Sequence, residues 1–367
     1  MPQKFATLSA LRAHGFDTLI DVRSPTEYAE DHVPGAISLP VLSDDERATV
    51  GTIYTQEAPF KARKIGAALV ARNAALHIEG PLEGKDGAWR PLVYCWRGGQ
   101  RSGSFTSILQ QIGWRADVID GGYRSYRRLV VAAMHDTALP HRLILIDGNT
   151  GTAKTEILHR LAARGTQIVD LEGLAAHRGS VFGPVTTPQP SQKAFEGALA
   201  DAFDRLDPAV PVVVEAESSK IGNVAIPPSV WAAMRAGPRL FLGAPLAARA
   251  RYLTTAYADM VDDPAVLQHT LGLLIPFHGH DQIDAWREMA DSGQYELLAY
   301  QLMERHYDPR YTKSRSNRDG GIMDEIALND LKSDDLNRAT DAIMTRIKAG
   351  QRTAELAEKT RPDLGPD

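Results

Sequence analysis

The sequence predicts an α/β protein with two successive parallel-sheet domains and a helical C-terminal extension. Short apolar runs alternate with helical segments over the first 135 residues and again from residue 142, which is typical of strands and helices around parallel sheets. From residue 245 to about residue 307 the pattern is helical. The expected divisions are a first domain over residues 1–135, a linker over 136–141, a second domain over 142–244, a helical extension with a basic segment over 245–320 and a polar tail over 321–367.

In the first domain, three apolar runs predict strands: Thr18–Val22, Pro91–Trp96 and Ala116–Gly122. In the second domain the predicted strands are Leu143–Asp147, Gln167–Leu171, Val212–Glu217 and Arg239–Gly243. Helical segments follow the first two of these strands at KTEILHRLAARG and SQKAFEGALADAFDRL. Pro140 marks the linker between the two domains.

Composition limits the classes of function. Among the 367 residues, 43% are hydrophobic and 24% charged, which excludes a wholly disordered or collagen-like chain. The net charge of −5 does not mark the whole protein as a nucleic-acid binder, although a local basic face stays open. No apolar stretch approaches the ~20 residues of a membrane span, and the N-terminal segment lacks the apolar core of a secretory signal. The single cysteine excludes an internal disulfide, so we expect a cytoplasmic protein without a membrane partner.

Cys95 ends a predicted strand and opens the segment CWRGGQRS. Gly98 and Gly99 let backbone amides converge above the sulfur, and a helix expected to begin near Ser102 points its positive end at the same place. Together with two arginines, these features favour a thiolate that can hold a persulfide, a perselenide or a tetrahedral oxyanion. A reactive thiol is therefore favoured over an inert buried cysteine. The anion loop consists of Arg97, Gly98, Gly99, Gln100, Arg101 and Ser102.

GNTGTAKT lies directly between a predicted strand and a predicted helix, as a Walker A phosphate loop does. Its residues are Gly148, Asn149, Thr150, Gly151, Thr152, Ala153, Lys154 and Thr155. Lys154 supplies a point charge, and the Thr155 hydroxyl could bind phosphate or Mg²⁺. Ala153 stands where the motif has its final glycine, which weakens the case for ordinary nucleotide hydrolysis and leaves diphosphate binding open. A helix capped by a Thr/Gly turn is the alternative.

Acidic and basic residues suggest further contacts. Glu215 and Glu217 alternate along a predicted strand and would share one face, where they could hold a cation, act as a base or be solvated acids. A basic run that includes Tyr307 and Tyr311 suits phosphate contact and base stacking. The candidate contacts to RNA or substrate are Arg310, Lys313 and Arg315, then Arg124, Arg127 and Arg128, and finally His177 and Arg178. Solvated charged faces and a structural histidine are the alternatives.

Several of these segments together resemble known families. D-V-R-x-P-x-E-Y, H-V-P-G-A-I, C-x-R-G-G-x-R-S and D-G-G-Y occur in the order found in rhodanese domains, which carry a chalcogen on the loop cysteine. The resemblance implies that role for Cys95. With DLEGLAAHRGSVFG, EAESSKIGN and ERHYDPRY, residues 10 to 315 resemble the tRNA 2-selenouridine synthase family. The tail after Gly320 carries no matching motif.

The family resemblance implies a reaction and its substrates. Sulfur at C2 of the wobble 2-thiouridine, in tRNAs for Lys, Glu and Gln, would be replaced by selenium from selenophosphate after S-geranylation by geranyl diphosphate. No tightly bound cofactor and no protein partner are expected. Two other interpretations stay open: a rhodanese-type sulfurtransferase fused to a nucleotide-dependent kinase-like domain, and a non-enzymatic tRNA-binding module.

Overall fold

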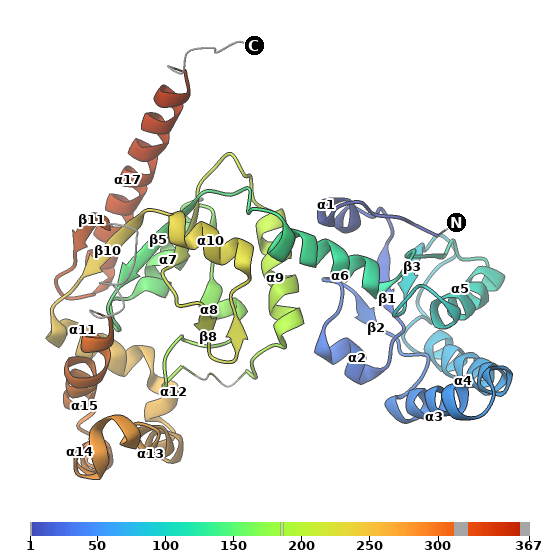
Figure 1. Ribbon diagram of the computed structural model, residues 1–367, viewed down its shortest axis with the longest axis horizontal. Helices are drawn as coiled ribbons and strands as arrows, with labels where there is room; N and C mark the ends of the chain where they lie inside the picture. Colours follow the sequence, from blue (N-terminus) through green and yellow to red (C-terminus); the bar gives the residue numbers. More distant parts are fainter. Residues whose placement is uncertain (1, 184, 186, 312–321, 360–367) are drawn as a thin grey trace. The chain divides into compact units, whose positions relative to one another are not determined.

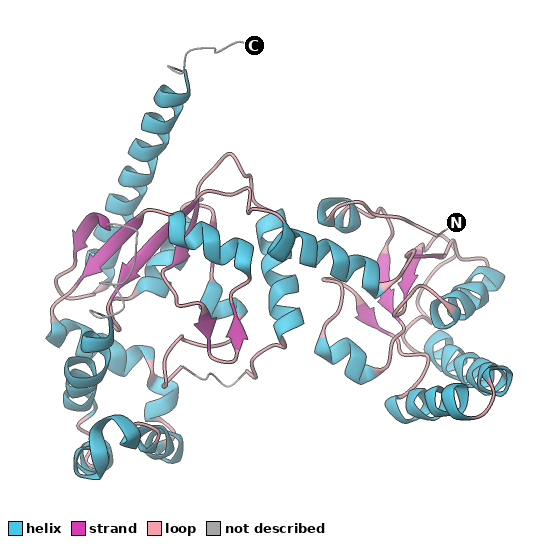
Figure 2. Cartoon of the chain, in the orientation of Figure 1, coloured by secondary structure: helices cyan, strands magenta, loops and turns pink. Residues whose placement is uncertain are grey.

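The computed structural model describes residues 2–183, 185, 187–311 and 322–359. The chain divides into two compact units: unit 1 contains Met1–Thr137 and Pro190–Arg205, and unit 2 contains Ala138–Gln189 and Leu206–Asp367. Each unit has a parallel sheet with helices packed against it, so the predicted α/β class is confirmed (Figures 1 and 2).

The sheet of unit 1 has the strand order β2–β1–β3–β4, and all its neighbours are parallel. The strands are β1 (Thr18–Asp21), β2 (Ile37–Ser38), β3 (Pro91–Tyr94) and β4 (Asp117–Val118). β1, β3 and β4 are shorter than the apolar runs that predict them, because the chain leaves the sheet early, and no apolar run predicts β2. After β1, for example, the Asp21 carboxylate accepts the Arg23 backbone N–H and turns the chain. The same shortening leaves Cys95 just beyond the end of β3.

Helices pack against this sheet and form the apolar core of unit 1 together with it. They are α1 (Leu8–Arg12), α2 (Pro25–Glu30), α3 (Asp44–Gln56), α4 (Pro59–Glu79), α5 (Gln100–Ile112), α6 (Tyr123–Val131) with the π-helical turn η1 (Ala132–Asp136), and α9 (Gln192–Asp204). Val70 of α4 and Phe105 of α5 pack against Ile20 and Val93 of the sheet. The sulfur-bearing Cys95 belongs to the same apolar core.

Residues 190–205 pack with unit 1, although the sequence places them in the second domain. Ser191 caps α9 and also donates its hydroxyl to the backbone carbonyl of Glu30. The buried Glu196 accepts a hydrogen bond from Arg127. Since a buried carboxylate is costly without a cation, this pair explains why α9 stays with α6. No local pattern in the sequence reports such a long-range pairing.

The sheet of unit 2 has the strand order β11–β10–β5–β7–β6, again all parallel. The strands are β5 (Leu143–Gly148), β6 (Ile168–Val169), β7 (Val212–Glu215), β10 (Arg239–Gly243) and β11 (Ile322–Ala327), with a separate antiparallel pair β8 (Lys220–Ile221) and β9 (Val224–Ala225). β5 is the central strand. Its carboxyl end is therefore the expected place for a ligand-binding loop.

Helices cover both faces of this sheet. They are α7 (Lys154–Ala163), α8 (Leu171–Leu174), α10 (Pro228–Ala236) and α17 (Ser333–Lys359). Ile157 of α7 and Ile343 of α17 share a core with Ile146. Leu145 points to the opposite face, next to Gly237 at the end of α10, as strand alternation requires.

The C-terminal region of unit 2 differs from the expected polar tail over residues 321–367. β11 extends the sheet as its edge strand, and α17 buries one face through Leu336, Ala339, Ile343 and Ile347. These apolar positions recur at helical spacing, but the segment as a whole is rich in charged residues. Its composition alone therefore predicts a polar tail. Residues 322–347 therefore belong to the core of unit 2.

A helical lobe between β10 and β11 completes unit 2. Its elements are α11 (Leu246–Ala256), α12 (Ala258–Val261), α13 (Pro264–Gly272), α14 (Ile275–Asp291) and α15 (Tyr295–Leu302), followed by the π-helical turn η2 (Met303–Tyr307). Trp286 and Leu271 are fully buried at its centre. Among the described residues, no helix combines the length and apolar character needed to cross a bilayer.

Candidate functional site

The thiol loop of unit 1, residues 95–102, joins β3 to α5. Cys95 is 4% exposed, and its sulfur accepts a hydrogen bond from the Ser102 hydroxyl at 3.2 Å. α5 begins at Gln100, two residues before the expected start, and its first backbone bond runs from Gly103 N–H to Gly99 C=O at 2.9 Å. The N–H groups that precede this bond have no helical carbonyl to bind. The sulfur thus lies where a helix N-terminus favours negative charge.

Two glycines hold the thiol loop in shape by close backbone approach. A Cβ on Gly98 would lie 2.6 Å from the Ile119 carbonyl oxygen, and a Cβ on Gly122 would lie 2.2 Å from the Cys95 carbonyl oxygen. Both residues have positive φ. Gly99 differs, because a Cβ there would meet nothing within 4 Å. Gly122, rather than Gly99, is therefore the second glycine that this loop requires.

The two arginines of the thiol loop have different surroundings. Arg101 donates to both carboxylate oxygens of Glu27, at 2.6 and 3.2 Å, and Glu27 also pairs with Arg47 at 3.0 Å. These hydrogen bonds outweigh burial and hold the pKa of Glu27 below its ordinary value. Arg97 is exposed. The Arg101 charge is thus committed within the fold, whereas the Arg97 side chain is open to solvent.

The phosphate loop of unit 2, residues 148–155, joins β5 to α7. A Cβ on Gly148 would lie 2.6 Å from the Thr152 hydroxyl, and a Cβ on Gly151 would lie 3.1 Å from the Arg249 Cβ. Ala153 adopts φ 59° and ψ 32°, the left-handed conformation that the missing glycine would favour. The loop therefore accepts the alanine methyl, which is buried in the core of unit 2.

Lys154 curls back over this loop. Its ammonium group donates to the backbone carbonyls of Gly148 at 3.0 Å and Asn149 at 3.4 Å. Burial alone would lower the pKa of Lys154, but surrounding groups, with Tyr311 and Glu217 foremost, raise it above the ordinary value. The loop therefore holds a fixed positive charge.

Carboxyl groups surround Lys154 in an arrangement that sequence reasoning missed. Glu172 accepts a hydrogen bond from Thr155 at 3.2 Å and lies next to Glu217. Burial and the Glu217 charge raise the pKa of Glu172 to about 8, despite the nearby Lys154. Glu172 therefore keeps its proton to a higher pH than an exposed glutamate does. Its signals in the sequence are its place one residue after a predicted strand and its position in the segment DLEGLAAHRGSVFG.

Glu215 and Glu217 take separate roles rather than one shared strand face. β7 ends at Glu215, which is fully buried and accepts the Leu171 backbone N–H at 3.2 Å. Burial, and then the charges of Asp170 and Glu172, raise the pKa of Glu215 well above its ordinary value. Glu217 lies beyond the strand and approaches Gly179, where a Cβ would come within 2.7 Å of its carboxylate. The chain turns between the two residues, so strand alternation does not apply.

Thr155, Glu172 and Arg178 line one cleft with the phosphate loop. The Arg178 guanidinium stacks on Tyr257 with 4.6 Å to the ring centroid, which aims a cation at the cleft. His177 accepts the Gly179 N–H at 3.1 Å, and burial lowers its pKa. Arg178 therefore lines the cleft, whereas His177 stabilises the neighbouring turn through its hydrogen bond to Gly179.

Arg249 also supports the phosphate loop, although no motif pointed to it. It is buried, donates to the Thr150 carbonyl at 3.1 Å and pairs with Asp308 at 2.7 Å. Through these contacts α11 holds the loop from the side of the helical lobe. Among the described residues, no group of three His, Cys, Asp or Glu side chains could hold a metal ion.

The predicted RNA contacts divide into paired and exposed residues. Arg127 is bound to the buried Glu196. Arg124 and Arg128 are both exposed, and Arg128 also donates to Ser125. Arg310 is exposed and stacks on the half-exposed ring of Phe277 at 4.2 Å. Lys313 and Arg315 lie outside the described residues.

The two tyrosines of the basic run differ from the base-stacking role expected of them. Tyr307 is buried in the core of the helical lobe, so it cannot stack on a base. Tyr311 lies beside Lys154, with its ring centroid 5.8 Å from the ammonium. Phe277, which the basic run does not contain, provides the exposed aromatic ring of this surface.

Comparison with known proteins gives matches in both units. Residues 5–129 match the family model of the rhodanese-like domain, and residues 141–273 match that of the tRNA 2-selenouridine synthase AAA domain. A relative from Aeromonas salmonicida is 33% identical, and the match covers 82% of this chain and 88% of the relative. Relatives from Bdellovibrio bacteriovorus and Nitrosomonas europaea are 34% and 36% identical over 69% and 63% of this chain. The chain spans less than two thirds of those two, at 66% and 61%, and all three are named tRNA 2-selenouridine synthase.

Proposed function

Because this chain belongs to the tRNA 2-selenouridine synthase family, we propose that it is an enzyme that replaces the sulfur at C2 of 2-thiouridine in tRNA with selenium. The observation that carries the proposal is the presence, in one chain, of a thiol loop and a phosphate loop. A thiol at a helix N-terminus suits an anionic chalcogen donor, and a lysine-capped loop suits a diphosphate.

The first step that we propose is S-geranylation at the phosphate loop. The thiouridine sulfur attacks C1 of geranyl diphosphate, so an S–C1 bond forms while the C1–O bond breaks, diphosphate leaves and the N3 proton of the base passes to water. Lys154 and the loop amides stabilise the charge that develops on the diphosphate. A protonated Glu172 supports this role, because a neutral acid repels the phosphates less than a carboxylate does.

The second step uses selenophosphate at the thiol loop. The Cys95 thiolate attacks the phosphorus of selenophosphate, so an S–P bond forms, the P–Se bond breaks and hydrogen selenide anion leaves. This anion adds to C2 of the geranylated base while the C2–S bond breaks, its proton moves to N3, and the geranyl thiolate that leaves takes a proton from water. Water then hydrolyses the S–P bond to phosphate and thiol. The Ser102 hydroxyl contacts the Cys95 sulfur, which is the nucleophilic atom of this step.

The tRNA substrate, and the wobble position in tRNAs for Lys, Glu and Gln, are part of the same proposal. Arg310 on Phe277 offers a cation and an aromatic face side by side on the exposed surface of unit 2. That pairing suits phosphate contact together with stacking on an unpaired base. Arg124 offers a further exposed cation in unit 1.

Radiolabelled selenophosphate, incubated with geranyl diphosphate and tRNA that contains 2-thiouridine, tests the function. Wild-type protein should transfer the label to the RNA, and Cys95→Ser should reduce the transfer at least a thousandfold, because a serine hydroxyl is far less ionised than a thiol. Thr106→Ser, a change in α5 away from the loop, is the matched control. Label that never reaches the RNA, with sulfur transfer from thiosulfate instead, would favour a sulfurtransferase. RNA binding without any transfer would favour a binding module.

A further inference from the structure

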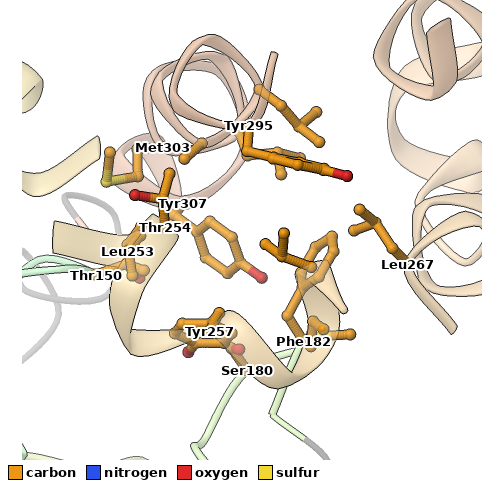
Figure 3. A pocket seen from close by; sticks show the side chains of 15 residues that line it. Thr150, Ser180, Phe182, Leu253, Thr254, Tyr257, Leu267, Tyr295, Met303 and Tyr307 are labelled. Atoms are coloured by element: carbon orange, nitrogen blue, oxygen red, sulfur yellow. The ribbon is translucent and has the colours of Figure 1, made fainter. Parts of the chain in front are cut away.

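An apolar pocket lies in the helical lobe of unit 2, next to the phosphate loop (Figure 3). It holds about 80 Å³ of space that water-sized groups can occupy, and it is partly open to solvent. Apart from Thr150, Ser180 and Thr254, its lining consists of apolar and tyrosine side chains, among them Leu253, Tyr257, Leu267, Leu298, Ala299 and Met303.

The pocket is continuous with the cleft of the phosphate loop. Thr150, Ser180, Leu253 and Tyr257 line both spaces. In Figure 3, Thr150 and Leu267 lie at opposite sides of the pocket, so its long direction leads away from the phosphate loop. A ligand anchored at Lys154 could therefore extend past Leu253 into the lobe.

The chemistry of the two spaces is complementary to one kind of molecule. The cleft offers the fixed charge of Lys154 and the Arg178 guanidinium. The pocket offers buried apolar side chains, among them Leu298, Met303 and Leu267. The cleft favours anions, whereas burial in the apolar pocket is favourable only for apolar groups.

We infer that this pocket holds the apolar chain of a diphosphate ester whose diphosphate lies in the phosphate loop. This assignment rests on the proposed function and names the site that selects the prenyl substrate. α15, which carries Leu298 and Ala299, forms one wall of the pocket and limits the length of the apolar ligand chain that fits. The pocket thereby determines specificity for chain length.

Filling the pocket from α15 tests the inference. Ala299 lines the pocket and is half-buried, so Ala299→Phe adds an aromatic ring there without removing a buried group. Ala265→Phe, on the exposed face of α13, is the matched control. Calorimetry on the full-length chain measures the dissociation constants of geranyl diphosphate and of inorganic diphosphate. A thermal unfolding scan confirms folding, and Ala299→Leu replaces Ala299→Phe if the larger ring prevents folding.

The wild-type chain should bind geranyl diphosphate at least roughly tenfold more tightly than inorganic diphosphate, because even one methylene in an apolar pocket changes affinity by about 10- to 200-fold. Its binding should also show a more negative heat-capacity change, the mark of apolar burial. Ala299→Phe should remove both differences and leave the affinity for inorganic diphosphate within about twofold. Ala265→Phe should change neither.

Two results overturn the inference. Equal affinities of the wild-type chain for the two ligands would mean that the pocket is a gap in the core, and an unchanged affinity ratio in folded Ala299→Phe would place the chain elsewhere. Lys154→Ala separates these results from a failure of the proposed function. If that variant weakens binding of both ligands, the phosphate loop holds the diphosphate and only the pocket assignment fails. If it weakens neither, the proposed geranylation at this loop fails with it.

Discussion

The thiol loop of unit 1 and the phosphate loop of unit 2 occupy the same position in their folds but differ in their electrostatics. Each follows a parallel strand and leads into a helix. At the thiol loop, Glu27 takes up the Arg101 charge and a hydroxyl contacts the sulfur. At the phosphate loop, the Lys154 charge stays within the loop, among carboxyl groups. The strand–loop–helix scaffold thus occurs twice, while the surrounding side chains decide between a nucleophile and a site for a leaving group.

Separating the two half-reactions should give the largest effect. Cys95→Ser should abolish selenium incorporation and leave geranylation within about twofold, because alkylation of the base does not need the thiol. Lys154→Ala should weaken geranyl diphosphate binding more than tenfold, since a charged hydrogen bond contributes about 1.5–3 kcal/mol. Chromatography of digested tRNA, with 2-thiouridine and pre-geranylated tRNA as separate substrates, measures both steps. If each variant loses both steps equally, the two loops do not have separate tasks.

The glycines of the thiol loop offer a stability test. Gly122→Ala should lower the free energy of unfolding of unit 1 by about 2–5 kcal/mol, from overpacking against the Cys95 carbonyl and a left-handed backbone. Gly103→Ala, at the start of α5 with open space around it, is the control and should be neutral or stabilising by up to about 1 kcal/mol. Urea unfolding followed by circular dichroism measures both. A neutral Gly122→Ala would show that the loop has room to relax.

Replacing basic residues should weaken RNA binding in unit 2 but not at Arg127 of unit 1. Neutralising Arg310, Lys313 and Arg315 together should lower the slope of log affinity against log salt by roughly 2 to 3, because each phosphate contact contributes about 0.7–0.9. Arg127→Ala in unit 1 should leave the slope unchanged and lower stability, since Arg127 is paired with the buried Glu196. Filter binding at several salt concentrations measures the slope. The same slope in the triple variant would leave RNA binding to Arg124 or another surface.

The smallest expected effect concerns the proton on Glu172. Its pKa of about 8 in the folded chain exceeds the ordinary value of 4.5, so between these pH values the folded state holds a proton that the unfolded chain has released. Stability should therefore fall as pH rises from about 5 to 8. Glu172→Gln should remove this fall, and Glu288→Gln on the exposed face of α14 should keep it. Thermal unfolding at several pH values measures how stability changes with pH. If Glu172→Gln shows the same pH dependence as the wild-type chain, Glu172 is ionised.

The two parallel sheets and the positions of the two loops can be predicted from the sequence. Alternating apolar runs and helical segments predict the two parallel sheets, because each strand buried on both faces must be apolar along its length. The thiol and phosphate loops can be located for a related reason. Both depend on residue types at fixed spacing, namely Cys95 before two glycines and Lys154 after a glycine-rich turn, and local spacing is visible in one dimension.

Only the tertiary structure decided which distant groups meet. Glu196 of α9 joins Arg127, and Glu172 lies beside Glu217, although many residues separate the partners in each pair. β11 and α17 complete the core of unit 2 from a segment that reads as polar. The apolar pocket likewise collects side chains from Thr150 to Tyr307. Burial and charge act through space, so these pairings, the pKa that they shift and the pocket that they enclose arise only once the chain has folded.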